Sequence, residues 1–327
     1  MKVVSGGRET DLCFMSPTWR GDLDRFALLR ESLCVFGHGA VPHYALVNSE
    51  DRDLLERLKL PGVIALTTSD LLPAQVEARR IRYNAQRGGV RWKRFQRSLY
   101  KRLGWFPDAR YYGWQIQQLL KLAAPPSLPH EVVVSFDSDL VVTGDFSLEC
   151  YVPGGQVVLY ERYSAIDPLL GPERWYANAC RLLDAPQLAG RDCDHVAQPF
   201  VFERRAVVRL HAWLEHRYQR PWHEVLIAEP LGAWSEFMIY GVFVRHHLKM
   251  DGFVSALSND HHIWLQTEEQ RRRAPEIIAQ AFDDPDIHYL VLQADDHGRW
   301  PLDRFVAELR PRLAQAAALR NSASRLS

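Results

Sequence analysis

The sequence lacks an excess of charge of either sign, a leader segment and any long apolar run. Forty Lys and Arg residues balance forty Asp and Glu residues among 327, so no overall field draws the chain to nucleic acid. The opening MKVVSGGRETDLCFMS has no charged head followed by an apolar segment, and nowhere do about 18 apolar residues follow one another. We therefore expect a cytoplasmic protein, with any affinity for a charged surface confined to a local patch.

Cysteine is also scarce. The five cysteines are odd in number, widely spaced and never in a C-x-x-C pair, which argues against both a disulfide framework and a structural zinc site. We expect most of them to be buried thiols. They are Cys13, Cys34, Cys150, Cys180 and Cys193.

Short apolar runs alternate with helical patterns in the first part of the chain. A hydrophobic content of 47% is enough to bury a full core, and the alternation is typical of a parallel α/β sheet. Strands are predicted at 11–17, 43–48 and 62–68, and helices at 22–37 and 51–60.

One segment, 79–102, is biased in charge, with ten Lys or Arg residues and no acid. After the break at Gly88-Gly89 it carries Trp92, Phe95 and Leu99 at helical spacing. One interpretation is a solvated helix whose apolar stripe docks on the core. The other is a surface for an anionic acceptor or for the inner face of a membrane, which would make the protein a peripheral membrane protein.

Two aspartates follow an apolar strand in VVVSFDSDLVVTGDF, residues 132–146. Residues i and i+2 of an extended chain point the same way, so Asp137 and Asp139 can present both carboxylates at the end of the strand, where open α/β sheets bind ligands. Two hard oxygen ligands suit Mn²⁺ or Mg²⁺, which keep positions open for substrate phosphates. The alternative is a turn in which Asp139 or Asp145 binds nearby backbone amides.

With this motif the sequence resembles the GT-A glycosyltransferases, nucleotide-sugar enzymes with a D-x-D after a central strand. The resemblance covers roughly residues 10 to 265 and is closest to bacterial members that make cell-surface polysaccharide. It rests on FDSDLVVTGDF, on the preceding YYGWQIQQLLKLAAP, on FMSPTWRGDLDRF after the first strand and on WSEFMIYG downstream.

The resemblance implies an α/β GT-A fold, a Rossmann-like nucleotide-sugar-binding sandwich with a mixed, mainly parallel central sheet. We assign it to residues 1–265, and we expect 266–327 to be a mostly helical C-terminal extension with a polar tail. The implied activity is metal-dependent transfer of a sugar from a nucleoside diphosphate donor to a carbohydrate acceptor, either a polysaccharide or a lipid-linked glycan.

The resemblance also implies roles for single residues. Asp139 would be the direct metal ligand, and Asp137 would bind the ribose or reach the ion through water. Ser16 and Thr18 would lie at the nucleotide. His261 or His262 would add a late metal ligand, although two adjacent histidines also suit an ordinary polar loop.

Inverting transfer needs a carboxylate that takes the proton of the acceptor hydroxyl. Glu236 is the candidate, with Trp234 beside it to pack against the acceptor sugar. Alternatively, Glu236 merely complements the dipole of the helix that starts there. Gln118 and Lys121, one helical turn apart, would face the donor sugar or diphosphate, or else form a solvated helix face.

Two other functions are compatible with the same residues. In a haloacid-dehalogenase-like phosphatase, Asp137 would be the nucleophile and Asp139 the general acid or base. That motif usually opens its domain, whereas three predicted strands come first here. In a non-enzymatic binding protein the D-x-D would be a mere turn, and no metal-dependent nucleotide binding would occur.

Overall fold

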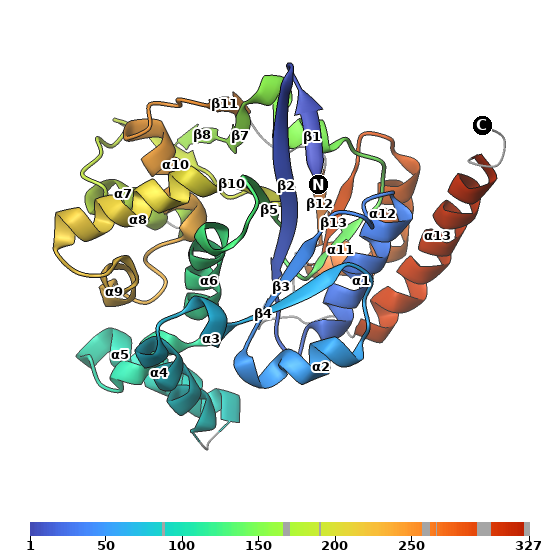
Figure 1. The fold of residues 1–327 in the computed structure, drawn as a ribbon. Coiled ribbons are helices and arrows are strands. Elements are labelled where there is room, and N and C mark those ends of the chain that lie inside the picture. Colours follow the sequence, from blue (N-terminus) through green and yellow to red (C-terminus); the bar gives the residue numbers. More distant parts are fainter. Residues whose placement is uncertain are drawn as a thin grey trace.

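The centre of the molecule is a six-stranded sheet (Figure 1). The computed structural model describes residues 1–86, 89–165, 171–189, 191–256, 262–265, 267–292 and 302–323. The strands of the sheet are β1 (Lys2–Ser5), β2 (Arg8–Pro17), β3 (His43–Val47), β4 (Val63–Thr67), β5 (Val132–Ser135) and β10 (Phe200–Glu203).

The strand order of this sheet creates a topological switch point. The order is β10-β5-β2-β3-β4, in which β2 to β5 run parallel while β10 pairs antiparallel with β5 and β1 with β2. The chain therefore builds outward from β2 through β3 to β4 and then returns to the other side of β2 with β5. Ligands of open α/β sheets bind at the carboxyl ends of the strands at such a reversal. The predicted mixed, mainly parallel sheet is confirmed.

The parallel strands are buried because helices cover both faces of the sheet. Every residue of β3 and of β5 is buried, the continuous burial expected of a covered parallel sheet rather than an alternating one. Helix α6 (Gly113–Ser127) contacts β2 and β5. Helix α1 (Leu23–Val35) contacts β3, where the rings of Phe26 and His43 lie 5.1 Å apart. In Figure 1, α6 and α1 lie on opposite sides of β2.

Smaller sheets and further helices complete the fold. Strand β7 (Val157–Tyr160) pairs with β11 (Phe253–Ala256), and β8 (Arg162–Ala165) with β9 (Arg191–Asp194). The helices are α2 (Arg52–Arg57), α3 (Thr68–Leu71), α4 (Ala74–Ala85), α5 (Gly89–Leu103), α7 (Gly171–Leu182), α8 (Arg204–Tyr218), α9 (Trp222–Ala228), α10 (Glu236–His246), α11 (Glu268–Arg272), α12 (Ala274–Asp283) and α13 (Leu302–Ala323), with 3₁₀ turns that include η1 (Ser49–Asp51) and η2 (Pro107–Tyr111).

The C-terminal residues are tied to the same core. Strand β13 (Tyr289–Val291) pairs antiparallel with β6 (Leu140–Val142), the strand that follows the D-x-D, and β12 (His262–Trp264) pairs with β13. Helix α13 packs on α1, and its Leu309 and Leu313 join the main hydrophobic cluster. The boundary predicted at residue 265 therefore does not separate two hydrophobic cores.

The cysteines are free thiols, and Cys13, Cys180 and Cys193 are buried. Cys34 is half-buried and Cys150 is exposed. Within the described ranges, every helix is too short or too polar to cross a bilayer.

Candidate functional site

The D-x-D lies where β5 ends, at the switch point of the sheet. β5 pairs with β2 in a register that places Ser135 opposite Met15, and continuing that register puts Asp137 beside Pro17, the last residue of β2. Asp137 and Asp139 are both partly exposed. The backbone carbonyl of Asp139 accepts a hydrogen bond of 2.8 Å from Leu292 N–H. The predicted position of the motif, just beyond the end of a buried strand, is confirmed.

Lys121 joins the D-x-D to the start of α10. Its Nζ lies 2.7 Å from Asp137 Oδ1 and 2.9 Å from Glu236 Oε1, and only 3% of the residue is exposed. Burial disfavours the ammonium, but the two carboxylates outweigh burial and hold the pKa of Lys121 above its ordinary value. The alternative of a solvated helix face is therefore wrong for Lys121 and for Gln118, which is also buried.

Glu236 is the first residue of α10 and is 1% exposed. Its backbone N–H donates to Gln118 Oε1 at 2.9 Å, and its second carboxylate oxygen accepts from Ser235 Oγ at 3.3 Å. Burial raises the pKa of Glu236, against the opposing attraction of Lys121. Four residues predicted from distant parts of the sequence, Gln118, Lys121, Asp137 and Glu236, thus form one connected cluster.

The predicted contact of Trp234 with the acceptor sugar is wrong. The residue is fully buried, so its ring packs in the core and has no surface that an acceptor sugar could contact. Its indole nitrogen is buried without a hydrogen-bond partner within the described part of the chain.

Gln198 is a member of the cluster that the sequence did not indicate. Its Nε2 donates to Asp137 Oδ2 at 2.6 Å, and its Oε1 accepts from the Asp137 backbone N–H at 3.1 Å. Gln198 is buried in the segment between β9 and β10. A single glutamine outside any motif carries no local signal, so only the antiparallel pairing of β10 with β5 brings it to Asp137.

The residues predicted to contact the nucleotide lie at the end of β2 but face inward. Ser16 is fully buried, and its Oγ lies 2.9 Å from His43 Nε2. Burial lowers the pKa of His43 to about 3, so its ring is neutral near pH 7. Thr18 is also buried, and its backbone N–H donates to the Leu46 carbonyl at 2.9 Å. The Ser16 hydroxyl is therefore used inside the core.

The structure does not test the two predicted histidine ligands. His261 lies outside the described residues, and His262 is the first residue of β12. Their roles as metal ligands stay predictions.

A pocket of about 610 Å³ opens at the carboxyl ends of β2 and β3. Trp19 and Arg20 continue from β2, so the chain leads directly from the residue beside Asp137 into this pocket. Arg20 and Lys93 supply positive charge, and the Trp19 ring is 41% exposed. The nucleotide contact is predicted for the hydroxyl residues of the fragment SPTW, Ser16 and Thr18. In the structure it is the tryptophan of this fragment, Trp19, that lines the pocket. The lining residues are Trp19, Arg20, Asn48, Ser49, Glu50, Ile81, Asn84, Ala85 and Lys93.

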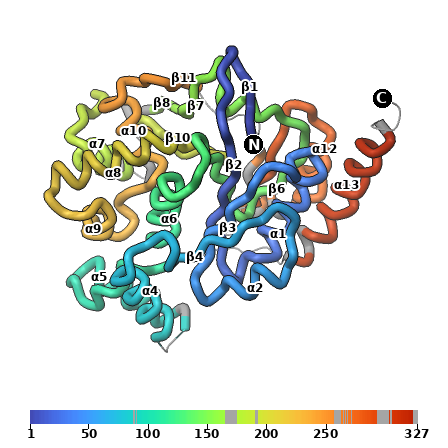
Figure 2. Tube along the Cα trace, in the orientation of Figure 1, coloured from blue at the N-terminus to red at the C-terminus, as the bar shows by residue number. Residues whose placement is uncertain are grey.

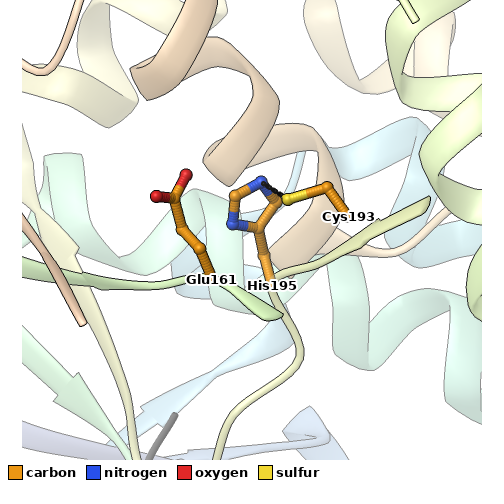
Figure 3. A group of neighbouring side chains, drawn as sticks. All are labelled: Glu161, Cys193 and His195. Carbon is orange, nitrogen blue, oxygen red and sulfur yellow. Dashed lines mark hydrogen bonds between the residues drawn. The ribbon is translucent and has the colours of Figure 1, made fainter. Parts of the chain in front are cut away.

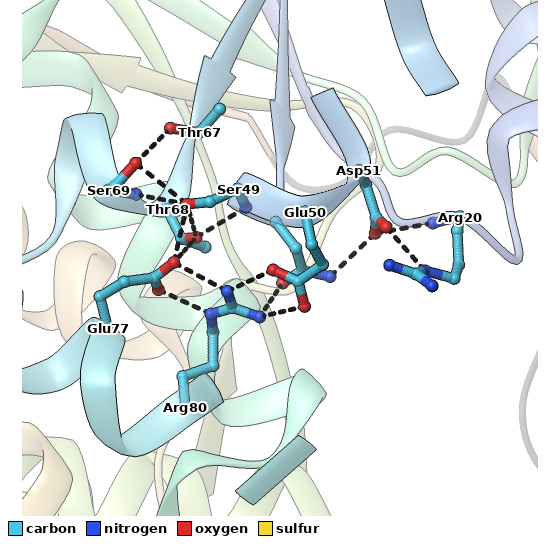
Figure 4. Close-up of polar contacts among 10 residues, drawn as sticks. Arg20, Ser49, Glu50, Asp51, Thr67, Thr68, Ser69, Glu77 and Arg80 are labelled. Atoms are coloured by element: carbon cyan, nitrogen blue, oxygen red, sulfur yellow. Dashed lines mark hydrogen bonds and ion pairs between the residues drawn. The ribbon is translucent and has the colours of Figure 1, made fainter. Parts of the chain in front are cut away.

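A buried ion network holds the wall of this pocket in place (Figure 4). Arg80 of α4 is 1% exposed and pairs with Glu77 and with Glu50, each at 2.6 Å. It also donates to Asn48 Oδ1 at 3.0 Å. On the other side of η1, Arg20 Nε donates to Asp51 Oδ1 at 2.7 Å. These contacts fix α4 and the β2 loop against the end of β3.

A second group of ligand-type side chains lies away from the D-x-D. Among the described residues, Glu161, Cys193 and His195 offer atoms within 4.8 Å of one another, all buried (Figure 3). The Glu161 carboxylate already accepts from Arg245 Nε at 2.8 Å and from Ser255 Oγ at 2.6 Å. The oxygens of Glu161 are therefore engaged in an ion pair that joins the residue after β7 to α10.

His195 is packed so closely on α10 that only glycine fits opposite it. A Cβ at Gly241 would lie 2.2 Å from His195 Cγ, and His195 is 1% exposed and hydrogen-bonded through Nδ1 to the Tyr160 carbonyl at 3.0 Å.

We expect Gly241→Ala to lower the free energy of unfolding by about 1–3 kcal/mol, because overpacking outweighs the gain in helix propensity of about 1 kcal/mol. Urea unfolding would measure the change. Gly113→Ala at the start of α6 is the matched control, since nothing lies within 4 Å of its Cβ position. Equal stability of the Gly241→Ala variant and the wild type would contradict the packing described.

Comparison with known proteins adds the following similarities. Residues 12–311 match the model of a family of unknown function, DUF6492. No curated protein matches the chain. An active-site mutant of LgtC is 9% identical with a TM-score of 0.44, over 91% of this chain and 95% of that one.

Two further solved structures are similar. Mouse xyloside xylosyltransferase 1 in its apo form is 11% identical with a TM-score of 0.39, over 86% of this chain and 98% of that one. Core-mannan synthase A from Aspergillus fumigatus, in an Mn/GDP form, is 7% identical with a TM-score of 0.47, over 77% and 74%.

Proposed function

The chain belongs to the family of unknown function DUF6492, and we propose that it is a metal-dependent glycosyltransferase that moves a sugar from a nucleoside diphosphate to a carbohydrate acceptor. The observation that carries the proposal is the position of the D-x-D. It lies at the switch point of a parallel sheet, at the same edge as a pocket whose lining includes Arg20 and Lys93. This edge of the sheet is where the fold binds ligands.

The residues present fit a divalent cation. Both Asp137 oxygens are engaged, one by Lys121 and the other by Gln198, so Asp137 would reach the ion through water or contact the ribose. The resemblance to the D-x-D enzymes gives Asp139 as the direct ligand. Mn²⁺ and Mg²⁺ are commonly held by one or two carboxylates plus substrate phosphates. When bound, such an ion neutralises the charge that develops on the diphosphate leaving group.

The pocket supports the position of the nucleotide. Trp19 offers an aromatic face for a base, and Arg20 and Lys93 offer positive charge for phosphates. We assign nucleotide contact to these three residues and to the backbone near Thr18, because the Ser16 hydroxyl is occupied by His43. Gln118 and Lys121 act toward the donor by holding Glu236 and Asp137.

The geometry favours a positioning role for Glu236 over its predicted role as a base. A base must reach the proton of the acceptor hydroxyl, whereas Glu236 is 1% exposed and paired with Lys121. Its carboxylate instead stabilises the ammonium that holds Asp137.

The rival phosphatase function finds no support in the fold. The D-x-D follows the fourth strand of the parallel set rather than opening the domain. A phosphatase would respond chiefly to metal and phosphate mimics, and a plain binding protein would respond to neither nucleotide nor metal.

Thermal unfolding with UDP or GDP, with and without Mn²⁺, tests the proposal. We expect one nucleotide together with Mn²⁺ to stabilise the chain by about 2.7 kcal/mol at 100 times its Kd, and Mn²⁺ alone to have much less effect. UMP or GMP is the matched control, since each keeps the base and the ribose but lacks the diphosphate. Stabilisation by phosphate mimics and metal without any response to a nucleoside diphosphate would contradict the transferase.

A further inference from the structure

Helix α5 docks on the protein by its polar face. Lys93 Nζ donates to the Asn84 carbonyl at 3.1 Å and lies 5.4 Å from the centre of the Tyr83 ring. Gln96 is 3% exposed and donates to Gln86 Oε1 at 2.6 Å. Helix α5 also contacts η2, and Arg97 lies 5.1 Å from the centre of the Tyr112 ring. These contacts use the polar side of α5.

The face turned outward is the apolar one. Trp92, Phe95, Leu99 and Leu103 follow one another at i, i+3, i+7 and i+11, so they share one side of the helix. Trp92 is 38% exposed, Phe95 49% and Leu103 57%. Trp105, just beyond the helix, is 60% exposed. Leu99 is half-buried and the Trp92 ring lies 6.0 Å from the Phe106 ring, so the stripe is only partly covered by the protein. An amphipathic helix in water normally buries its apolar stripe, and the exposure of Phe95 and Leu103 favours the second interpretation, a surface that binds an external partner.

Positive charge surrounds this apolar stripe. The segment 79–102 contains ten Lys or Arg residues and no acid. Arg80 is buried in the pocket wall and Arg82 lies 3.6 Å from Asp108. Arg91 and Arg102 are exposed beside the stripe. An outward apolar stripe rich in aromatic rings and flanked by basic side chains matches a helix that lies in the interface of an anionic bilayer.

We propose that α5 is a membrane-docking surface, with Phe95, Leu103 and neighbouring rings inserted at the level of the lipid headgroups and Arg91 and Arg102 facing anionic lipid. Charge complementarity selects this occupant over a second copy of the chain, because two such segments would bring only positive charge to each other. In Figures 1 and 2, α4 and α5 form a helical pair at the edge of the molecule, where a flat surface can reach them.

The docking surface also adjoins the proposed nucleotide pocket. Lys93 of α5 and Ile81 of α4 line that pocket, so docking would hold it near the lipid surface. This favours an acceptor that is itself attached to lipid, a step that rests on the proposed transferase.

Vesicle co-sedimentation tests the surface. The full chain is mixed with phosphatidylcholine vesicles, with and without phosphatidylglycerol. We expect binding to the anionic vesicles, and the charge-conserving variant Phe95→Ser with Leu103→Ser to lower the partition coefficient at least about tenfold, since two apolar side chains no longer leave water. Arg91→Gln with Arg102→Gln should lower it by a similar factor.

Leu319→Ser is the matched control, because Leu319 is 65% exposed but lies on α13; it should leave the partition coefficient unchanged. Absence of vesicle binding by the wild type, or equal binding by the Phe95→Ser, Leu103→Ser variant, would overturn the proposal. So would sedimentation equilibrium showing a dimer that these substitutions dissociate, without vesicle binding. The response of the same variants to nucleoside diphosphate and Mn²⁺ reports separately on the transferase.

Discussion

Asp139→Ala is expected to lower kcat/KM for sugar transfer by about a thousandfold, equivalent to about 4 kcal/mol of transition-state stabilisation. The reason is that Asp139 is the carboxylate best placed to hold the cation that neutralises the leaving diphosphate. The chain should still fold, because the side chain is partly exposed and the hydrogen bond from Leu292 goes to the backbone. Donor hydrolysis across a panel of nucleotide sugars, measured by release of the nucleoside diphosphate, would detect the loss.

Asp145→Ala is the matched control for this substitution. Asp145 lies a few residues further on, its side chain is 71% exposed, and it pairs with Arg320 of α13. Its removal should leave donor hydrolysis within about twofold of the wild type. If Asp139→Ala retained activity with its dependence on Mn²⁺ intact, Asp139 would not be the metal ligand.

Lys121→Met is expected to lower the free energy of unfolding by about 3–5 kcal/mol, because it leaves the Asp137 and Glu236 carboxylates without their shared cation. In the variant, the Glu236 carboxylate binds a proton more tightly when folded than when unfolded, because burial raises its pKa and the opposing attraction of Lys121 is gone. The loss of stability in Lys121→Met, relative to the wild type, should therefore grow as pH rises above about 4 and shrink below it. Urea unfolding of the variant and the wild type at several pH values would measure this trend.

A double variant separates the ion cluster from simple loss of packing. Adding Glu236→Gln to Lys121→Met removes one of the two stranded charges, so the double variant should be more stable than Lys121→Met alone by about 1–2 kcal/mol. Lys101→Met on exposed α5 is the control and should change stability by no more than about 0.5 kcal/mol. A Lys121→Met variant with a pH-independent deficit would show that the ammonium does not stabilise these carboxylates.

Much of the site could be predicted because its parts carry local signals. The D-x-D follows a β-branched run, which marks both a strand and its end. Gln118 and Lys121 lie one turn apart on a helix, so they share one face of it. Glu236 carries a different signal, because it lies at the predicted start of a helix. Only the fold shows that these three signals meet.

The remaining contributors depend on tertiary structure. Gln198 reaches Asp137 through the antiparallel addition of β10, a pairing that no periodicity reveals. Trp19 and Lys93 come together at one pocket from a loop and from α5, which are far apart in the sequence. The surroundings of the apolar stripe on α5 likewise depend on tertiary structure, since periodicity shows that a face is apolar but not what it faces.

The most direct test of the account is a crystal structure of the chain with Mn²⁺ and a nucleoside diphosphate, with the ion located by its anomalous scattering. The account predicts one manganese peak within bonding distance of a carboxylate oxygen of Asp139 and of the diphosphate. It also predicts the nucleotide in the pocket beside Trp19 and Arg20. A peak at Glu161, Cys193 and His195 instead, or a diphosphate bound away from the end of β5, would contradict it.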